Sequence, residues 1–223
     1  RPPSVFSLLR PIASLALAWA MGCAAPVVDP GGPPPDLAAP STEAPLTPSN
    51  LRVVARDAPV PLFDWTEEVD FDGFRHWFGR REDFTTRCEG SPVRNRAGES
   101  LVVEDYAEAE RLTAPLVAQC PVDPSLHLWR YAALLSLGRE SEAMLHRDWY
   151  VGLMESILTT GDGASPETAI VTISNSETFA VLSHLGLTAE RQWHVAGPPA
   201  LDVFVARTDA GERTSLYLSL IHI

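Results

Sequence analysis

Lysine is absent from this chain of 223 residues, so all 17 of its basic side chains are arginines. They are outnumbered by 29 aspartates and glutamates, and the formal net charge at pH 7 is -12. A protein with this excess of negative charge is repelled by phosphate backbones and by anionic lipid surfaces. The composition therefore argues against nucleic acid as a partner and against membrane binding through surface charge.

Sequence motifs of the familiar enzyme classes are missing as well. The chain has no Gly-x-Ser-x-Gly nucleophile elbow, no His-Glu-x-x-His zinc motif and no Cys-x-x-Cys pair. It has three cysteines, none with histidines at metal-ligand spacing, so we predict no metal site and no cofactor. Because 45% of the residues are hydrophobic, the chain can still build one ordinary globular core.

The N-terminal residues have the pattern of an export signal. Arg1 and Arg10 accompany an apolar run, residues 12–21, that is too short to span a bilayer comfortably. The run ends in Ala20-Met-Gly-Cys23, which resembles the lipobox of bacterial lipoproteins. The resemblance implies cleavage before Cys23 and acylation of that cysteine, and Ala24 after it favours sorting to the outer membrane. Cleavage nearby by ordinary signal peptidase, giving a soluble secreted protein, is the alternative.

The sequence therefore divides into four parts. Residues 1–22 are expected to be a lipoprotein signal peptide, and residues 23–50 a proline-rich, disordered tether. Residues 51–217 are expected to form the folded domain, attached to the membrane by the N-terminal lipid and facing the periplasm. The last residues, 218–223, read Leu-Ser-Leu-Ile-His-Ile, which a sequencing-adaptor sequence encodes when read in frame. A genuine last strand is the alternative reading of these six residues.

Two cysteines remain in the expected domain, Cys88 and Cys120. A pair of cysteines in the periplasm usually oxidises. A disulfide between them would close the intervening loop and stabilise the fold by ~3–4 kcal/mol. We favour this disulfide, and two buried free thiols are the alternative.

Apolar residues at three- and four-residue spacing predict helices over the first part of the domain. The expected helices are residues 67–79, 103–119, 124–137 and 140–158, with an irregular connection over residues 82–96. Pro115 should bend the second of these helices. Ala109 and Ala143 are about 34 residues apart, the period of tetratricopeptide repeats, in which small alanines let paired helices approach closely.

After residue 160 the pattern changes to short β-branched runs. Strands are expected at residues 169–173, 191–195, 202–207 and 214–218. A helix, residues 177–185, is expected between the first two strands, with Ser174 opening a capping box and Gly186 ending the helix. The predicted fold is α+β, with tetratricopeptide-like helical hairpins followed by a small β-sheet that carries one helix.

The junction between the two halves reads Thr160-Gly-Asp-Gly-Ala-Ser-Pro-Glu-Thr-Ala-Ile-Val-Thr-Ile-Ser174. With Phe179 and Leu185-Gly-Leu187, it resembles the diagnostic segment of the bacterial Domain of Unknown Function 4919 family. The resemblance extends to His146, to Gly152-Leu-Met-Glu-Ser-Ile157, and to Asp70-Phe71 with Arg75, and so covers about residues 69–217. It implies an exported or lipoprotein envelope protein and carries no activity.

The candidate site residues lie in and before this junction. The loop of Gly161, Asp162, Gly163, Ser165 and Glu167 brings a carboxylate and backbone amides together, which could bind a cation or a phosphate. A tight turn from helix to strand is the structural alternative. His146 is the other candidate polar group; like His127 it lies on a helix near tryptophan, where a histidine often serves the core through a hydrogen bond. Neither acts as a general base without a nucleophile, which the sequence does not reveal.

Three functional hypotheses follow from these features. The first is a lipid-anchored, non-enzymatic envelope protein whose helices and acidic surface bind another protein or peptide. The second is a module that binds a small ligand or a cation through the loop 161–167. The third and least favoured is a hydrolase that uses Asp162 with His146.

Overall fold

The computed structural model describes residues 69–89 and 91–221 of the chain. The expected signal peptide, Cys23 and the expected tether lie outside these residues. Among the described residues, one compact unit comprises Asp83–Leu153, and a second comprises Asp70–Glu82 together with residues 154–221. The first unit is helical and the second contains a four-stranded sheet, which confirms the predicted α+β class.

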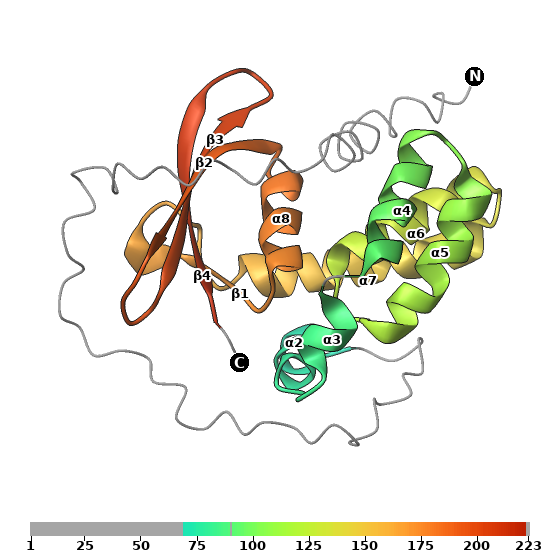
Figure 1. Cartoon of the computed structure of the whole chain (residues 1–223), viewed down its shortest axis with the longest axis horizontal. Coiled ribbons are helices and arrows are strands. Elements are labelled where there is room, and N and C mark those ends of the chain that lie inside the picture. Colours follow the sequence, from blue (N-terminus) through green and yellow to red (C-terminus); the bar gives the residue numbers. More distant parts are fainter. Residues whose placement is uncertain (1–68, 90, 222–223) are drawn as a thin grey trace. The chain divides into compact units, whose positions relative to one another are not determined.

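The first unit is built from α3 (Phe84–Cys88), α4 (Pro92–Val102), α5 (Tyr106–Gln119), α6 (Pro124–Ser136) and most of α7 (Glu140–Leu158). Helix α5 packs against both α4 and α6 (Figure 1). Small side chains allow close approach in this unit, since Ala97, Ala109, Ala133 and Ala143 are all fully buried. The two alanines that define the tetratricopeptide-like spacing are thus core residues, and the likeness to such repeats stays a prediction.

Local signals explain where α5 and α6 begin and end. The Asp105 carboxylate accepts a hydrogen bond from the amide of Glu108 at the start of α5. The Asp123 carboxylate does the same for two amides at the start of α6, where Pro124 occupies the first helical position. Gly138 follows α6 with a φ of 74°, a left-handed angle that ends the helix.

Two expectations for the first unit were wrong. Residues 82–96 are not irregular, because α3 occupies 84–88 and α4 begins at Pro92. Ser91-Pro92 is a helix-start signal, and Ala97 and Leu101 form the buried stripe of α4. Helix α5 begins at Tyr106 instead of Val103, because Glu104 takes a φ of 58° and interrupts the helical path.

The second unit contains α2 (Phe71–Gly79), the end of α7, β1 (Ile170–Thr172), α8 (Asn175–His184), β2 (Leu187–Val195), β3 (Leu201–Thr208) and β4 (Arg213–Leu220). The expected order of strand, helix and three strands is confirmed. The sheet order is β1-β4-β3-β2, with β1 parallel to β4 and the other pairs antiparallel. Helix α8 lies against one face of the sheet (Figure 1).

The ends of α8 follow the predicted signals. The Ser174 hydroxyl accepts a hydrogen bond from the amide of Glu177, and Gly186 turns the chain into β2 with a φ of 65°. Strand β2 begins at Leu187, four residues earlier than residue 191, where the sequence placed it. Residues 218–220 complete β4 and pair with β1. This pairing is compatible with either origin of the last residues, since leucine suits a strand whatever encoded it.

Candidate functional site

The loop of residues 161–167 is hydrogen-bonded to the last strand of the sheet. The Gly163 amide donates to the Thr168 carbonyl over 2.8 Å, and the Gly163 carbonyl accepts from the Tyr217 amide of β4 over 2.9 Å. The loop therefore closes on itself and is also fastened to β4. This arrangement is the tight turn between helix and strand that the sequence offered as the structural alternative.

The structure explains why both of these loop positions are occupied by glycine. A Cβ atom on Gly161 would collide with the Thr168 carbonyl and would lie 2.7 Å from the Ala169 carbonyl. Gly163 has a φ of 67°, and a Cβ atom there would lie 2.6 Å from Cδ1 of Leu216. Only glycine fits either position without displacing backbone or core.

The polar side chains of the loop bond mainly within it. The Asp162 carboxylate accepts from the Ala164 amide over 2.9 Å, and a hydrogen bond with Thr168 does most to lower the pKa of Asp162. Ser165 and Thr168 form a capping box around a single turn of 3-10 helix, Pro166–Thr168. The pKa of Glu167 is lowered by its own amide and by Ser165. Asp162 and Glu167 are therefore two exposed carboxylates that stay ionised at neutral pH.

His146 belongs to a buried chain of hydrogen bonds in the first unit. The Arg130 Nε donates to Nε2 of His146 over 3.0 Å, and Nδ1 of His146 lies 3.1 Å from Nδ1 of His127. Nε2 of His127 lies 2.9 Å from the Pro121 carbonyl. Arginine can only donate and a carbonyl can only accept, so we assign one proton order. His146 is protonated on Nδ1 and donates to His127, which is protonated on Nε2 and donates to Pro121.

This order keeps both imidazoles neutral. Burial is the main cause that lowers the pKa of His127 to about 4 and that of His146 to about 3. The hydrogen bond to Pro121 opposes the lowering of the His127 pKa, whereas the Arg130 charge adds to it. The pKa of His146 is lowered further by His127 and by Arg130. The His127 ring stacks on Trp149 with 5.1 Å between centroids. Every ring nitrogen is already hydrogen-bonded, so the pair supports the core and has no lone pair to offer a substrate.

An ionic network adjoins this chain. The carboxylate of Glu110 pairs with Arg130 at 3.1 Å and with Arg139 at 3.2 Å, and Arg139 also pairs with Glu142. These contacts hold the Arg130 guanidinium in position and bridge α5, α6 and α7. Arg130 is therefore already bonded to a histidine and to a carboxylate, and this arrangement does not suit it to bind an anion.

The second unit contains a buried ion pair that the sequence did not predict. Arg75 Nε lies 3.2 Å from a carboxylate oxygen of Glu177, and the two side chains are 0% and 1% exposed. Arg75 also donates to the Val171 carbonyl and to the Ser156 hydroxyl, each over 3.2 Å. The other Glu177 oxygen accepts from the Ile173 amide over 2.9 Å. Arg75 and Glu177 stand far apart in the sequence, so no local spacing signals the pair.

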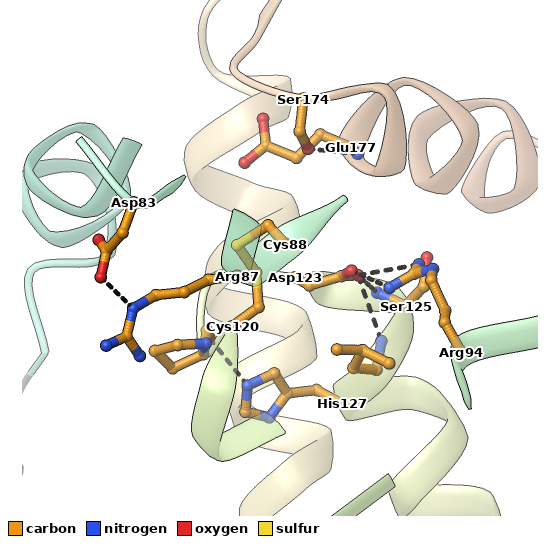
Figure 2. The surroundings of a disulfide bond; sticks show 12 residues. Asp83, Arg87, Cys88, Arg94, Cys120, Asp123, Ser125, His127, Ser174 and Glu177 are labelled. Atoms are coloured by element: carbon orange, nitrogen blue, oxygen red, sulfur yellow. Dashed lines mark hydrogen bonds and ion pairs between the residues drawn. A yellow bond between two sulfur atoms is a disulfide. The ribbon is translucent and has the colours of Figure 1, made fainter. Parts of the chain in front are cut away.

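Cys88 and Cys120 are joined in a disulfide, with 5.1 Å between their Cα atoms (Figure 2). The same figure shows Asp123, close to Cys120 in the chain, bonded to Arg94 and to the amide of Ser125. The Arg94 guanidinium lies over the Trp129 ring, 5.0 Å from its centroid. The end of α5, at Cys120, is thus tied to α3 by a covalent bond, and the start of α6, at Asp123, is tied to α4 by an ion pair.

The candidate residues therefore bond to partners within their own units. His146 belongs to the first unit and Asp162 to the second, and each is occupied by its own hydrogen-bond partners. Within residues 69–89 and 91–221, no group of three or more histidines, cysteines or carboxylates is arranged to hold a metal ion. In the same part of the chain, no helix is both long and apolar enough to cross a membrane.

Comparison with known protein families matches the chain to a family model. The family model described as Domain of unknown function (DUF4919) matches residues 93–222, more than half of the chain. The matched range includes the loop 161–167, the histidine pair and Glu177, and it begins after Arg75. Neither a curated protein nor a solved structure matches the chain significantly.

Proposed function

We propose a function for this chain from the premise that it belongs to the DUF4919 family. It is a lipid-anchored protein of the bacterial cell envelope, held through Cys23 and most consistent with an outer-membrane position facing the periplasm. Its folded part binds another protein or a peptide and performs no chemistry. The anchor and the location rest on the lipobox-like Ala20-Met-Gly-Cys23 alone.

The proposal that the protein is not an enzyme rests on the hydrogen bonds and the protonation of the candidate catalytic groups. His127 and His146 use all four ring nitrogens in internal hydrogen bonds, and their lowered pKa values keep them neutral. Asp162 closes its own turn. A general base needs a free lone pair near a nucleophile, and these groups do not provide it.

The interaction role is supported by the helices and by the charge. Helices α4, α5 and α6 pack through fully buried alanines, the kind of contact from which helical repeat proteins build binding surfaces. The chain is acidic, so a partner with a basic surface would gain both association rate and specificity from complementary charge. The disulfide is consistent with export, because such bonds persist in oxidising compartments.

The test is a purification of the full chain from detergent-solubilised envelope after crosslinking in cells. We expect one partner in stoichiometric amount, with binding weakened by salt. The variant Cys23→Ser should release the chain from the membrane fraction and still bind the purified partner in solution. Failure of Cys23→Ser to leave the membrane would refute the lipid anchor, and absence of a stoichiometric partner would refute the interaction role.

The second hypothesis, a cation or small-ligand site at the loop 161–167, has one observation in its favour. Asp162 and Glu167 are two ionised, exposed carboxylates on one short loop. If calcium or inorganic phosphate raises the melting temperature of the wild-type chain, and Asp162→Asn removes the increase, this hypothesis replaces the first. The matched control is Glu155→Gln, an exposed acidic position on α7 outside the loop, which should respond like the wild type.

A further inference from the structure

We propose that residues 57–68 dock on the face of the sheet opposite α8 and complete the core of the second unit. These residues end just before α2 and lie outside the described part of the chain. The inference goes beyond the proposed function, because it holds whether or not the chain is lipid-anchored or has a partner. It follows from an apolar cluster, a buried indole group and a set of arginines that share this face.

Helix α8 packs on one face of the sheet (Figure 1). The hydroxyl of Thr172 in β1 hydrogen-bonds with the hydroxyl of Thr178 in α8 over 3.1 Å, so the face that carries Thr172 is the α8 face. The register of the strands and the alternation of side chains place Trp193, Val203 and Tyr217 in one row on the other face.

This row belongs to a buried apolar cluster. Its members are between 1% and 8% exposed and comprise Trp193, Leu201, Val203 and Tyr217. Among the described residues, the other apolar side chains packed against the cluster are those of Val195 and Val205, which belong to the sheet itself, and of Ala169. A sheet face is buried by a second layer of chain and not by its own strands. Ala169 is too small to form that layer alone.

The indole of Trp193 indicates what the layer must offer. Its Nε1 is buried and has no hydrogen-bond partner among the described residues. A buried indole N–H normally has an acceptor. A length of extended backbone laid over the face would supply a carbonyl. Pro59 and Pro61 have no N–H, so residues 57–68 do not suit a further strand of the sheet but keep their carbonyls as acceptors.

The same face becomes positively charged next to the cluster. Alternation along the strands places Arg191, Arg207 and Arg213 on it. The Glu190 carboxylate pairs with both Arg207 and Arg213. These four side chains leave an excess of positive charge in a chain whose formal net charge is -12. The face therefore suits an occupant that is both apolar and acidic.

Residues 57–68 have this composition and are placed to reach the face. They contain no basic residue; their apolar residues include Val60, Leu62, Phe63 and Trp65, and their acidic residues are Asp57, Asp64, Glu67 and Glu68. They lead into α2, which belongs to the same unit as the sheet. Extended, they span up to about 40 Å, more than the diameter of a small domain. With this segment docked, the face is core and is not available to a partner.

The test uses the absence of lysine from the chain. In the full chain carrying Cys23→Ser, Ser215→Lys introduces one side-chain amine on this face, at an exposed position paired with Val205. A water-soluble carbodiimide joins an amine to a carboxylate that touches it, with loss of water, and mass spectrometry of peptides locates the amide. We expect the amide at an acidic residue of 57–68.

Two matched controls accompany this variant. Thr214→Lys introduces the amine at the neighbouring exposed position, which alternation places on the α8 face, and should give at least about tenfold less of the amide. Leu62→Asp, combined with Ser215→Lys, should lower its yield at least about tenfold, because a buried leucine stabilises the docked state by that much. Leu46→Asp, in the expected tether, should leave the yield unchanged.

Three results would overturn the proposal. The first is the absence of an amide between Ser215→Lys and residues 57–68. The second is an equal yield from Thr214→Lys, or a yield that Leu62→Asp does not lower. The third comes from a mixture of isotopically labelled and unlabelled chains. Amides that join one kind of chain to the other would show that the occupant of the face is a second copy.

Discussion

Arg75 and Glu177 form a buried ion pair whose two side chains also seal the edge of a strand. Strand β1 stands at the edge of the sheet, and its Val171 carbonyl accepts from Arg75 while the Ile173 amide donates to Glu177. The Val171 amide donates to the Thr160 hydroxyl. Exposed backbone groups on an edge strand invite pairing with another chain. Here three of them are satisfied by side chains: Arg75 of α2, Glu177 of α8, and Thr160, which lies two residues after α7.

Breaking this pair should be costly. Glu177→Gln leaves the Arg75 charge buried without its counter-ion, and removal of one partner of a buried pair typically costs about 3–5 kcal/mol. Chemical denaturation should show this loss in the free energy of unfolding. Arg75→Met should cost a similar amount, and the double variant Arg75→Met/Glu177→Gln clearly less than the sum, because it leaves no uncompensated charge.

The matched control for the ion pair is Asp72→Asn. Asp72 is the other carboxylate near Arg75, at 3.9 Å, and its side chain is 61% exposed. An exposed ion pair contributes at most about 1 kcal/mol, so this variant should unfold close to the wild type. Strict additivity of the Arg75 and Glu177 variants would show that the two charges do not depend on each other.

The sequence predicted those elements whose signals are local. Asp123-Pro124 and Gly138 mark the ends of α6, and the β-branched runs mark the strands, so both were placed within a few residues. Helix α4 was missed because Gly90, Pro92 and Asn95 led us to predict an irregular connection over residues 82–96. The helix also contains Gly98, a residue of low helix propensity. In the structure Gly98 packs against Trp129, whose ring would lie 3.4 Å from an added Cβ atom. A packing requirement, which has no local signature, outweighed helix propensity there.

The sequence could not predict which residues bond to the candidate site residues. It identified the loop 161–167 and offered a structural turn as one reading, because glycines beside an aspartate suggest a turn locally. It also suggested that His127 and His146 serve the core, but not that they bond to each other. That contact, like the pairing of Arg75 with Glu177, depends on how distant helices meet.

Alanine substitution of either glycine in the loop should destabilise the protein more than alanine substitution of a glycine with open space around it. Gly161→Ala brings a methyl group against backbone carbonyls, and Gly163→Ala adds a strained φ to a contact with Leu216. We expect each to lower the free energy of unfolding by more than about 2 kcal/mol. Gly211→Ala is the control, since its φ is 85° but no atom lies near the added methyl group. The free energy of unfolding of this variant should fall by only about 1 kcal/mol, the cost of a left-handed backbone angle at alanine. Equal losses at all three positions would contradict the packing argument.

The buried histidines should make the protein less stable in mild acid. The pKa of His127 is about 4 and that of His146 about 3, both below the ordinary value of 6.5. At pH values between these lowered pKa values and 6.5, the two histidines bind protons in the unfolded chain but not in the folded chain. Stability is therefore fully present above about pH 6.5 and falls as the pH drops toward 4, by up to about 1.4 kcal/mol per pH unit for each histidine. The lowered pKa values of His76 and His184 act in the same direction.

The measurement is the free energy of unfolding at several pH values between 7.5 and 5. His146→Gln keeps an acceptor for Arg130 and a donor for His127 but cannot titrate, so the slope of stability against pH should become shallower. At pH 7.5 the variant should be within about 1 kcal/mol of the wild type, because its hydrogen bonds are retained. A slope unchanged by His146→Gln would mean that this ring takes up its proton equally in both states.

Asp123 combines two roles that substitutions can separate. Its carboxylate pairs with Arg94 and also accepts from the amides of Ser125 and Leu126 at the start of α6. Asp123→Asn removes the negative charge but keeps an oxygen that can cap the helix, whereas Asp123→Ala removes both. We expect the alanine variant to be less stable than the asparagine variant by about 1 kcal/mol, the usual contribution of a helix N-cap. Urea denaturation of the two variants gives this difference directly. If they unfold at the same urea concentration with the same slope, the cap contributes nothing and Asp123 acts through Arg94 alone.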